Sequence, residues 1–350
     1  MKNVEKGIDP KEIGLVIVSS VDNQFIDQHQ IGALALQYLG NPTGEALRVE
    51  AACASGGMAT YVASKMIEAG EVKNALVVGL EKMTSLPVDT VTSILIRGGS
   101  PEEVRYGVTQ PAAYGFTAQY YMKKYGATED DFARVAVKNH ENALRNPWAQ
   151  FQKKITLDDV KNSKMVASPL RLYHCSPLTD GAAAIVLSSE PKAYTDNPVY
   201  VKGIGVGHDT LGVHERENPG FLKSSKIAAD AAYRKAKVAA ERVQIAEVHD
   251  AFVHVELMAY EAVGLAKEGE GYRIMREGRT QFDGDLPVNV SGGLKAKGHP
   301  IGATGVGMLV EMYLQLRGEA GARQVPDVET ALIENHGGTG ATSVVTILGR

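Results

Sequence analysis

Short, almost uninterrupted apolar segments alternate along this chain with longer segments of helical periodicity. In the first part of the chain, strand-like segments at Leu15–Ser19, Ala46–Glu50 and Ala75–Gly79 are separated by helical patterns at Phe25–Leu39 and Cys53–Glu68. Strands that are apolar on both faces are typical of sheets that helices cover on both sides. The alternation therefore predicts an α/β fold built on a mostly parallel sheet.

The same pattern starts again after residue 190. The segment Asp180–Leu187 resembles Gly340–Leu348, since each follows a polar turn and continues into a β-branched strand. This weak repeat predicts two similar α/β halves, residues 1–190 and 191–350. Residues 84–170 are richer in charge and tyrosine, and we expect them to form an inserted loop domain. The other expected strands are Val199–Val206, Ile245–Val248, Val288–Val290, Thr330–Ile333 and Ser343–Leu348, and the helices are Ser225–Ala236, His249–Val263 and Gly302–Leu316.

The composition excludes several functional classes. A net charge of −4 without a basic run gives no sign of nucleic-acid binding or of a membrane surface. The two cysteines, Cys53 and Cys175, are too few for a disulfide framework or a cysteine metal cluster. The segment Met1–Lys6 lacks the apolar core of a signal peptide, and no apolar stretch is long enough to span a bilayer. We therefore expect a cytoplasmic protein.

Cys53 lies in a segment of small residues, Glu50–Met58, between a predicted strand and a predicted helix. Unpaired N–H groups and the positive end of the helix dipole favour a thiolate there. Such a position can lower a thiol pKa from about 8.5 to roughly 3.5–7.5, and the small neighbours would let a substrate carbonyl reach the sulfur. Cysteine is also a common buried structural residue, so this segment alone leaves both roles open.

Glycines gather in three clusters that contain or adjoin reactive side chains. One cluster directly follows Cys53, the second (residues 292–307) contains His299, and the third (residues 337–340) follows His336. Glycine permits close approach of the backbone to a ligand, so we expect the three loops to converge on one site. A histidine in such a loop is a candidate base or oxyanion donor.

A further histidine, His249, ends a predicted strand and is followed by Asp250, which is well placed to cap the next helix. On its own, His249 would more often be a structural histidine. The glycine loop around His299 has neither the P-loop nor the Rossmann spacing. His249, His299 and His336 are not spaced as one metal motif, so no metal is expected.

Taken together, these motifs resemble the thiolase superfamily, and most closely the archaeal acetoacetyl-CoA thiolases and the sterol-carrier-protein-type thiolases. Five ordered matches carry the resemblance, which covers the whole chain. They are the nucleophile loop at Cys53, the block Ser176–Ala184, the box His249–Phe252, the loop Gly298–Gly305 and the segment Asn335–Gly340. The family fold has five layers, αβαβα, from two similar halves with an inserted loop domain, which agrees with the internal repeat.

The resemblance implies a mechanism. His299 would take the proton of Cys53, and the thiolate would attack acetyl-CoA to form an acetyl-enzyme. A second acetyl-CoA would lose an α-proton, and its enolate would attack the acetyl group to give acetoacetyl-CoA and CoA; the reverse reaction is thiolysis. Backbone N–H groups of Cys53 and Gly337 would form one oxyanion hole, and His249 with His299 the other. Coenzyme A thioesters are the substrates, and no permanently bound cofactor is implied.

The chain departs from the family pattern at the second catalytic cysteine. Many thiolases use a cysteine in Cys-x-Gly as the base for the incoming acetyl-CoA, but here Asn335-His336-Gly337 stands in its place, with Asn335 at the cysteine position. Ala251 occupies the position where sterol-carrier-type enzymes can carry a cysteine, and we expect Cys175 to be structural. His336 and His249 are therefore the candidates for the second base.

The chain also departs from the pattern at its start. The family opens with a strand and a helix before the segment that matches Leu15–Ser19, and the resemblance places that first strand centrally in the first sheet. This first strand and helix are missing, so we expect the chain to be N-terminally incomplete or to have a rebuilt first half. Loss of a central strand would leave unpaired backbone groups.

The resemblance also implies partners. Thiolases dimerise through the nucleophile half, so a homodimer or homotetramer is expected. Residues 84–170 are short beside the CoA-binding loop domain of tetrameric bacterial thiolases. Archaeal relatives bind acyl-CoA with a separate small zinc-ribbon and OB-fold protein, sometimes with HMG-CoA synthase attached. Candidate contacts to coenzyme A within this chain are Lys223, Ser225, Lys295 and Lys297.

Other functions share these motifs. A degradative 3-ketoacyl-CoA or sterol side-chain thiolase, or a retro-aldol lyase, would use most of them, although the presence of both Cys53 and His299 argues against the lyase. A condensing relative such as HMG-CoA synthase or a ketoacyl synthase shares the fold, but the Gly298–Gly305 loop and the Asp180–Ala184 block are thiolase-like. A non-catalytic CoA-binding scaffold is a further alternative, since the second cysteine is absent.

Overall fold

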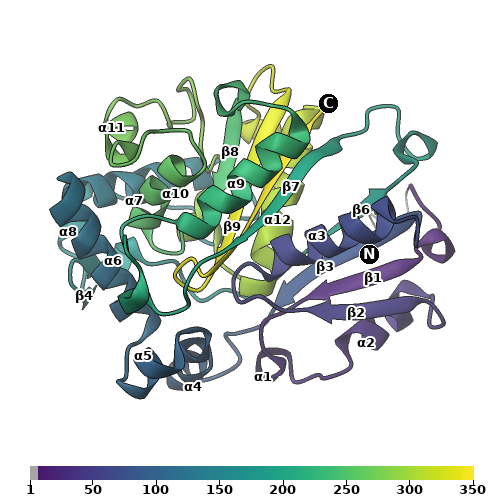
Figure 1. The fold of residues 1–350 in the computed structure, drawn as a ribbon, viewed down its shortest axis with the longest axis horizontal. Coiled ribbons are helices and arrows are strands. Elements are labelled where there is room, and N and C mark those ends of the chain that lie inside the picture. Colours follow the sequence, from purple (N-terminus) through teal and green to yellow (C-terminus); the bar gives the residue numbers. More distant parts are fainter. Residues whose placement is uncertain (1–6) are drawn as a thin grey trace.

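A computed structural model describes residues 7–350, and two mixed sheets form its frame (Figure 1). In the first sheet, β1 pairs in parallel with β2 and β3, and β6 runs antiparallel to β3. The strand order is β2 (Glu45–Val49), β1 (Leu15–Ser19), β3 (Asn74–Glu81) and β6 (Gly181–Ser188).

Helices cover both faces of the first sheet. Successive side chains of a strand point to opposite faces. Val16 of β1 therefore packs on the side of α2 (Ile31–Leu39), whereas Ile17 packs on the side of α3 (Ser55–Glu68). As its apolar sequence predicts, β1 is buried along its whole length.

The second sheet differs from the expectation of mostly parallel strands, which is wrong for this half. Of its neighbouring pairs, β8 and β9 are parallel, whereas β9–β10 and β10–β7 are antiparallel. The short glycine turn between β9 and β10 is the physical reason, because such a turn can join only antiparallel neighbours. The segment Val288–Val290 contributes a single bridge, Ala246 to Val288. The strand order is β7 (Tyr200–His208), β10 (Thr342–Gly349), β9 (Thr330–Gly337) and β8 (Ile245–Val248).

The two sheets enclose a middle layer of helices (Figure 1). The middle layer contains α3 and α12 (Ile301–Arg317); α2 covers the outside of the first sheet, and α9 (Lys223–Ala236) with α10 (Val253–Ala262) covers the outside of the second. This arrangement confirms the predicted αβαβα fold. Glycines let the middle helices meet, since a Cβ on Gly56 would lie 2.7 Å from the Val306 nitrogen. The contact brings together the helix ends that follow Cys53 and His299.

The two sheets repeat part of one another. β1, β3 and β6 have the same order and directions as β8, β9 and β10. At the centre of the first sheet, β1 is hydrogen-bonded on both sides, to β2 and to β3. The difference lies at the edge: β10 has β7 as a further neighbour, whereas β6 pairs only with β3 among the described strands.

Two predicted helices have different boundaries. The pattern Phe25–Leu39 is divided into α1 (Asn23–Ile26) and α2, because Asp27 adopts a left-handed conformation with a φ of 48°. The pattern His249–Val263 becomes helical only at Val253, where α10 begins. His249 therefore lies in the loop between β8 and α10, where its ring packs against those of His299 and His336.

Residues 84–170 form a mainly helical layer at one side of the molecule (Figure 1). Its helix α7 (Glu129–Ala143) packs against α10 and against a π-helical turn, Gly293–Lys297, that precedes His299. None of the helices in residues 7–350 is long and apolar enough to cross a membrane. The remaining elements are α4 (Val88–Leu95), α5 (Pro101–Arg105), α6 (Gln110–Tyr125), α8 (Leu157–Lys161), β4 (Met165–Ala167), β5 (Leu170–Arg171) and α11 (Gly271–Arg276).

Candidate active site

Cys53 lies in a tight turn between β2 and α3. Ala52 has a left-handed backbone conformation with a φ of 49°, which is unusual for a residue with a side chain and stores local strain. The Ser55 hydroxyl fixes the turn, since it accepts the Ala51 N–H at 2.8 Å and donates to the Ala52 carbonyl at 2.5 Å. The turn therefore holds the thiol just ahead of the first residue of the helix.

The thiol of Cys53 is protonated in the resting protein. Burial raises the pKa of Cys53 to about 12, although the backbone N–H groups of Gly338 and Cys53 act in the opposite direction. The expectation of a lowered thiol pKa is therefore wrong. Desolvation of the charged form outweighs the helix dipole, and α3 begins only at Ser55. A neighbouring base has to take the proton before the sulfur can act as a nucleophile.

His299 has the protonation state of such a base. Its Nδ1 lies 2.7 Å from the Thr304 hydroxyl, which donates its own proton to the Pro300 carbonyl at 3.1 Å. Thr304 therefore accepts from His299, so the imidazole proton is on Nδ1 and the lone pair is on Nε2. Burial lowers the pKa of His299 to about 3, so the ring is neutral at pH 7.

His249 has the opposite tautomer, which Asn335 determines. The Asn335 amide is oriented by two contacts, since its Oδ1 accepts the Gly57 N–H at 3.0 Å and its Nδ2 donates to the Cys53 carbonyl at 2.9 Å. The same Nδ2 faces His249 Nδ1 at 3.2 Å, so Nδ1 accepts and the proton is on Nε2. Burial keeps the pKa of His249 well below its usual value. His249 is therefore a neutral hydrogen-bond donor.

His336 is oriented by a buried carboxylate. Its Nδ1 donates to Glu334 Oε1 at 3.0 Å. The same carboxylate accepts hydrogen bonds from the Ser225 hydroxyl at 2.7 Å and from the backbone N–H of His249 at 3.1 Å. The His336 Nε2 atom has no hydrogen-bond partner in the described residues. A histidine held in this way by a carboxylate is a common general base. Sequence reasoning missed the role of Glu334, although its i, i+2 spacing from His336 on β9 places both on one face.

The thiol and two of the imidazoles form one compact cluster. A ligating atom from each of Cys53, His249 and His299 lies within 4.8 Å of the others, and the His249 ring centroid is 4.3 Å from that of His336. These distances alone would suit a metal ion. A metal would need the Nε2 lone pair of His249, and the proton would then have to move to Nδ1, which faces the Asn335 amide donor. The hydrogen bonding therefore fits acid–base chemistry better than a metal.

Besides that of Cys53 itself, the backbone N–H that lowers the pKa of the thiol belongs to Gly338, the residue after the expected Gly337. Gly337 lies inside β9, and any Cβ there would collide with the Ala51 carbonyl, so its importance is close packing. Two side chains that sequence reasoning missed hold the Gly338 peptide. The Tyr114 hydroxyl donates to the Gly338 carbonyl, and Arg216 donates to the Thr339 carbonyl at 2.6 Å.

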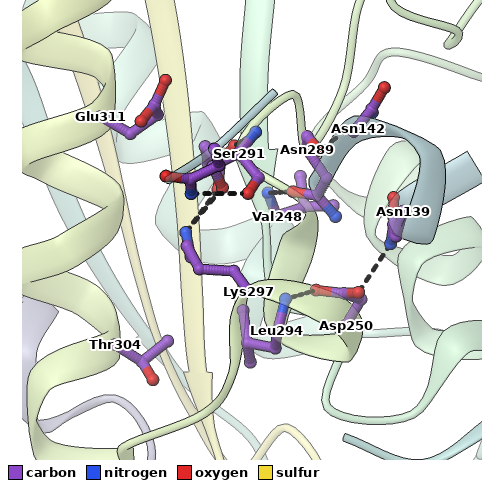
Figure 2. A network of polar contacts seen from close by, with 12 residues as sticks. Asn139, Asn142, Val248, Asp250, Asn289, Ser291, Leu294, Lys297, Thr304 and Glu311 are labelled. Atoms are coloured by element: carbon purple, nitrogen blue, oxygen red, sulfur yellow. Dashed lines mark hydrogen bonds and ion pairs between the residues drawn. The ribbon is translucent and has the colours of Figure 1, made fainter. Parts of the chain in front are cut away.

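The four expected coenzyme A contacts differ in their exposure and in their partners. Lys223 is exposed at the start of α9. Ser225 is fully buried and donates to Glu334. Lys297 donates to Glu247 at 3.1 Å and to Ser291 at 2.7 Å, as Figure 2 shows for the region of Ser291. Lys295 is buried near two aromatic rings, at 5.2 Å from that of Phe151. Of the four, Lys223 alone is exposed to solvent.

The chain is similar to known proteins along its whole length. Residues 3–191 match the thiolase N-terminal domain, and residues 205–350 match the thiolase C-terminal domain-like family. The acetyl-CoA acetyltransferase of Methanothermobacter thermautotrophicus is 41% identical over 99% of this chain and 91% of its own length. Sterol carrier protein 2 of Bos taurus is 34% identical over 96% of this chain and 63% of its own length.

A solved structure has the same fold. The Ltp2-ChsH2(DUF35) aldolase superposes with a TM-score of 0.83 at 24% identity, and the match covers 99% of this chain and 89% of the other. The two domain matches and the level of identity agree with the αβαβα architecture. The chain therefore belongs to the thiolase family of acyl-transferring enzymes.

Proposed function

We propose that this enzyme condenses two molecules of acetyl-CoA to acetoacetyl-CoA and CoA, reversibly, through an acetyl group on Cys53. One observation carries the proposal: the sulfur of Cys53 and one ring nitrogen each of His249 and His299 lie within 4.8 Å of one another. The hydrogen bonds of the two rings make Nε2 of His299 the base and Nε2–H of His249 the donor. The name of the archaeal relative, acetyl-CoA acetyltransferase, supports the same reaction.

In the first half-reaction, His299 takes the proton of Cys53 as the sulfur attacks the thioester carbonyl. Backbone N–H groups of Cys53 and Gly338 stabilise the resulting oxyanion; one such donor contributes about 10²–10³ in rate. The bond between the carbonyl carbon and the sulfur of coenzyme A then breaks. The departing thiolate takes the proton from His299, so that acetyl-Cys53 and CoA are formed and the base is neutral again.

In the second half-reaction, His336 removes an α-proton from a second acetyl-CoA. The enolate oxygen accepts a hydrogen bond from Nε2–H of His249. His299, the other expected donor, is neutral at this stage with its lone pair on Nε2, so it donates no hydrogen bond to the enolate. The enolate carbon attacks the acetyl carbonyl, a carbon–carbon bond forms, and the bond to Cys53 breaks. The proton removed at the start returns to the Cys53 sulfur. If Gly338 supplies the oxyanion donor, His336 rather than Asn335 corresponds to the cysteine of the Cys-x-Gly pattern.

A short acyl chain is favoured by the packing around the thiol. Cys53 packs against a cluster of nearly inaccessible apolar side chains. A degradative thiolase for long 3-ketoacyl or sterol side chains would need more space there. The members of the cluster are Phe25, Met83, Val91, Ile94 and Ile301.

The chain-length assignment is tested by thiolysis with CoA of acetoacetyl-CoA and of longer 3-ketoacyl-CoA substrates. We expect the ratio kcat/KM to be highest for acetoacetyl-CoA. A higher value for a long-chain substrate would identify a degradative thiolase instead. Absence of turnover with every substrate, without acylation of Cys53, would favour a non-catalytic scaffold.

We further propose that the enzyme is a cytoplasmic homodimer or homotetramer and that a small acyl-CoA-binding protein, with or without HMG-CoA synthase, assists it. Lys223 is an exposed candidate for direct contact with the CoA phosphates, and one structural relative, the Ltp2-ChsH2(DUF35) aldolase, has a DUF35 component in its name. The affinity of the isolated chain for acetyl-CoA tests the need for a partner. Tight binding with full turnover would remove that need, and a monomer at working concentration would contradict the oligomer.

A further inference from the structure

The sequence of the loop that leads to His299 does not by itself determine the conformation of the loop. It runs from Asn289 through the π-helical turn Gly293–Lys297. Gly292, Gly293 and Gly298 have φ values of 105°, 57° and 113°, a region that glycine enters freely and other residues avoid. Because glycine also has many alternative conformations, the surroundings of this loop must fix it.

Asp250 binds the π-helical turn directly (Figure 2). Its Oδ1 accepts the Leu294 N–H at 2.6 Å, and its Oδ2 accepts the Lys295 N–H at 3.2 Å. Burial and the neighbouring Glu256 raise the pKa of Asp250 to about 7, and the two loop N–H groups offset part of this rise. The turn and the charge of Asp250 therefore stabilise each other. Gly293 fits closely against this carboxylate, since a Cβ there would lie 2.5 Å from Asp250 Oδ2.

Helix α7 and the residue Asn146 after it supply three buried amides, one of which contacts Asp250 while the other two contact the loop itself. Each is at most 1% exposed. Buried amides are costly unless they are hydrogen-bonded, so this surface is specific for one backbone arrangement. The contacts are Asn139 to Asp250 Oδ2 at 2.7 Å, Asn142 to the Asn289 carbonyl at 3.1 Å, and Asn146 to the Ser291 carbonyl at 2.8 Å.

A buried ion pair completes the network. Glu256 accepts hydrogen bonds from the amides of Asn139 and Asn289, each at 2.7 Å. Its other oxygen pairs with the ammonium group of Lys138, which also donates to the Val288 carbonyl at 3.0 Å. Lys138 and Glu256 have no exposed side-chain surface. The inserted segment thus supplies both charge and amides to the strand end and loop that carry His299.

We propose that Asp250, supported by the amides of α7, is a positioning residue for His299. The inference rests on the proposed function. Asp250 contacts the backbone of the turn, and it acts on the reaction by fixing where the His299 ring meets Cys53. The inserted segment therefore has a second role besides any contact with the acyl group, because it holds the base of the first half-reaction in place.

The test compares Asp250→Asn with a matched control, Glu261→Gln. Like Asp250, Glu261 is a buried carboxylate, but it lies on α10 and binds Tyr121 and the Gly271 N–H, away from the His299 loop. Single-turnover acetylation of Cys53 by acetyl-CoA is measured at pH 7, with KM for acetyl-CoA, the melting temperature and alkylation of Cys53 by iodoacetamide at pH 10. A small displacement of a catalytic group can cost about 10²-fold in rate, so Asp250→Asn should slow acetylation by about that factor.

A positioning role predicts a selective loss. In Asp250→Asn, KM for acetyl-CoA should match the wild type. The rate of Cys53 alkylation at pH 10 should also match it, because solvent base replaces His299 at that pH. The control Glu261→Gln should be acetylated at the normal rate, with a melting temperature similar to that of Asp250→Asn. Wild-type acetylation in Asp250→Asn would overturn the inference, and so would an equal loss in Glu261→Gln or a parallel loss of alkylation. If Asp250→Asn does not fold, Asn142→Ala should show the same selective loss of acetylation rate, at a smaller magnitude. A normal acetylation rate in Asn142→Ala would then overturn the inference equally. A wild-type protein that is not acetylated would instead contradict the proposed function, and the inference with it.

Discussion

The two halves of the molecule hold their reactive groups in different ways. In the first half, β2 is exposed or half-buried along its length, and Cys53 at its end is half-buried. In the second half, β8 and α10 are buried at every residue and β9 at nearly every residue. Cys53 therefore follows a partly exposed strand and is itself half-buried, whereas the histidines are built into the core.

The difference extends to protonation. Each imidazole has a partner that determines which nitrogen carries the proton: Thr304 for His299, Asn335 for His249 and Glu334 for His336. The sulfur of Cys53 is approached mainly by backbone N–H groups, and burial keeps it protonated. We therefore propose that the first half supplies the reacting atom and that the second half supplies the acid–base chemistry that makes it react.

Removal of the sulfur should have the largest effect. We expect Cys53→Ala to lower kcat for thiolysis by roughly four to six orders of magnitude, as loss of a covalent nucleophile does elsewhere. Cys175→Ala is the matched control, because Cys175 is the other free thiol. Steady-state rates with acetoacetyl-CoA and CoA measure both. Equal losses in the two variants would remove the special role of Cys53.

Removal of the His299 imidazole, the proposed base in the second half of the molecule, should have the second largest effect. His299→Ala is expected to slow acetylation of Cys53 by about 10²–10⁴-fold, the usual effect of losing a general base. His208→Ala, which changes an exposed histidine bound to Thr342, should have no effect. A rate close to normal in His299→Ala would show that the sulfur does not depend on this ring.

Variants of the Glu334–His336 pair should affect the second half-reaction more than the first. His336→Ala should slow condensation more than acetylation of Cys53, by about 10²-fold, since His336 is proposed to act only on the second acetyl-CoA. Glu334→Gln keeps the side-chain shape and should have a smaller effect of the same kind. The ratio of condensation rate to single-turnover acetylation rate is the measurement. Equal slowing of both steps would point to His249 or to a water molecule as the second base.

The pH dependence of thiol alkylation tests the neutral thiol–imidazole pair. The pKa of Cys53 is raised to about 12 and that of His299 is lowered to about 3. Because the thiolate is the nucleophile, the rate of alkylation by iodoacetamide should rise about tenfold per pH unit between pH 6 and 9. A rate that is independent of pH over this range would reveal a thiolate–imidazolium ion pair. His299→Ala should keep the same slope.

Local sequence predicted the elements of the site better than its chemistry. Cys53 at a strand-to-helix turn and His299 in a glycine loop could be predicted because both depend on neighbours in the chain. The raised pKa of Cys53 could not, since burial depends on the whole fold. The tautomer of His249 depends on Asn335, which is far away in the sequence, and the support of the His299 loop by α7 arises only on folding. Similarly, the antiparallel β9–β10 pair of the second sheet depends on a tight turn that apolar periodicity does not reveal.

The most direct test of the account is the mass of the intact protein after incubation with acetyl-CoA. We expect one acetyl group per chain, located on Cys53 by peptide mapping and removed again by free CoA. His336→Ala should still acquire it, whereas Cys53→Ala should not. Absence of the acetyl group from the wild type, or acetylation of Cys53→Ala at the wild-type rate, would contradict the proposal that the first half supplies the nucleophile.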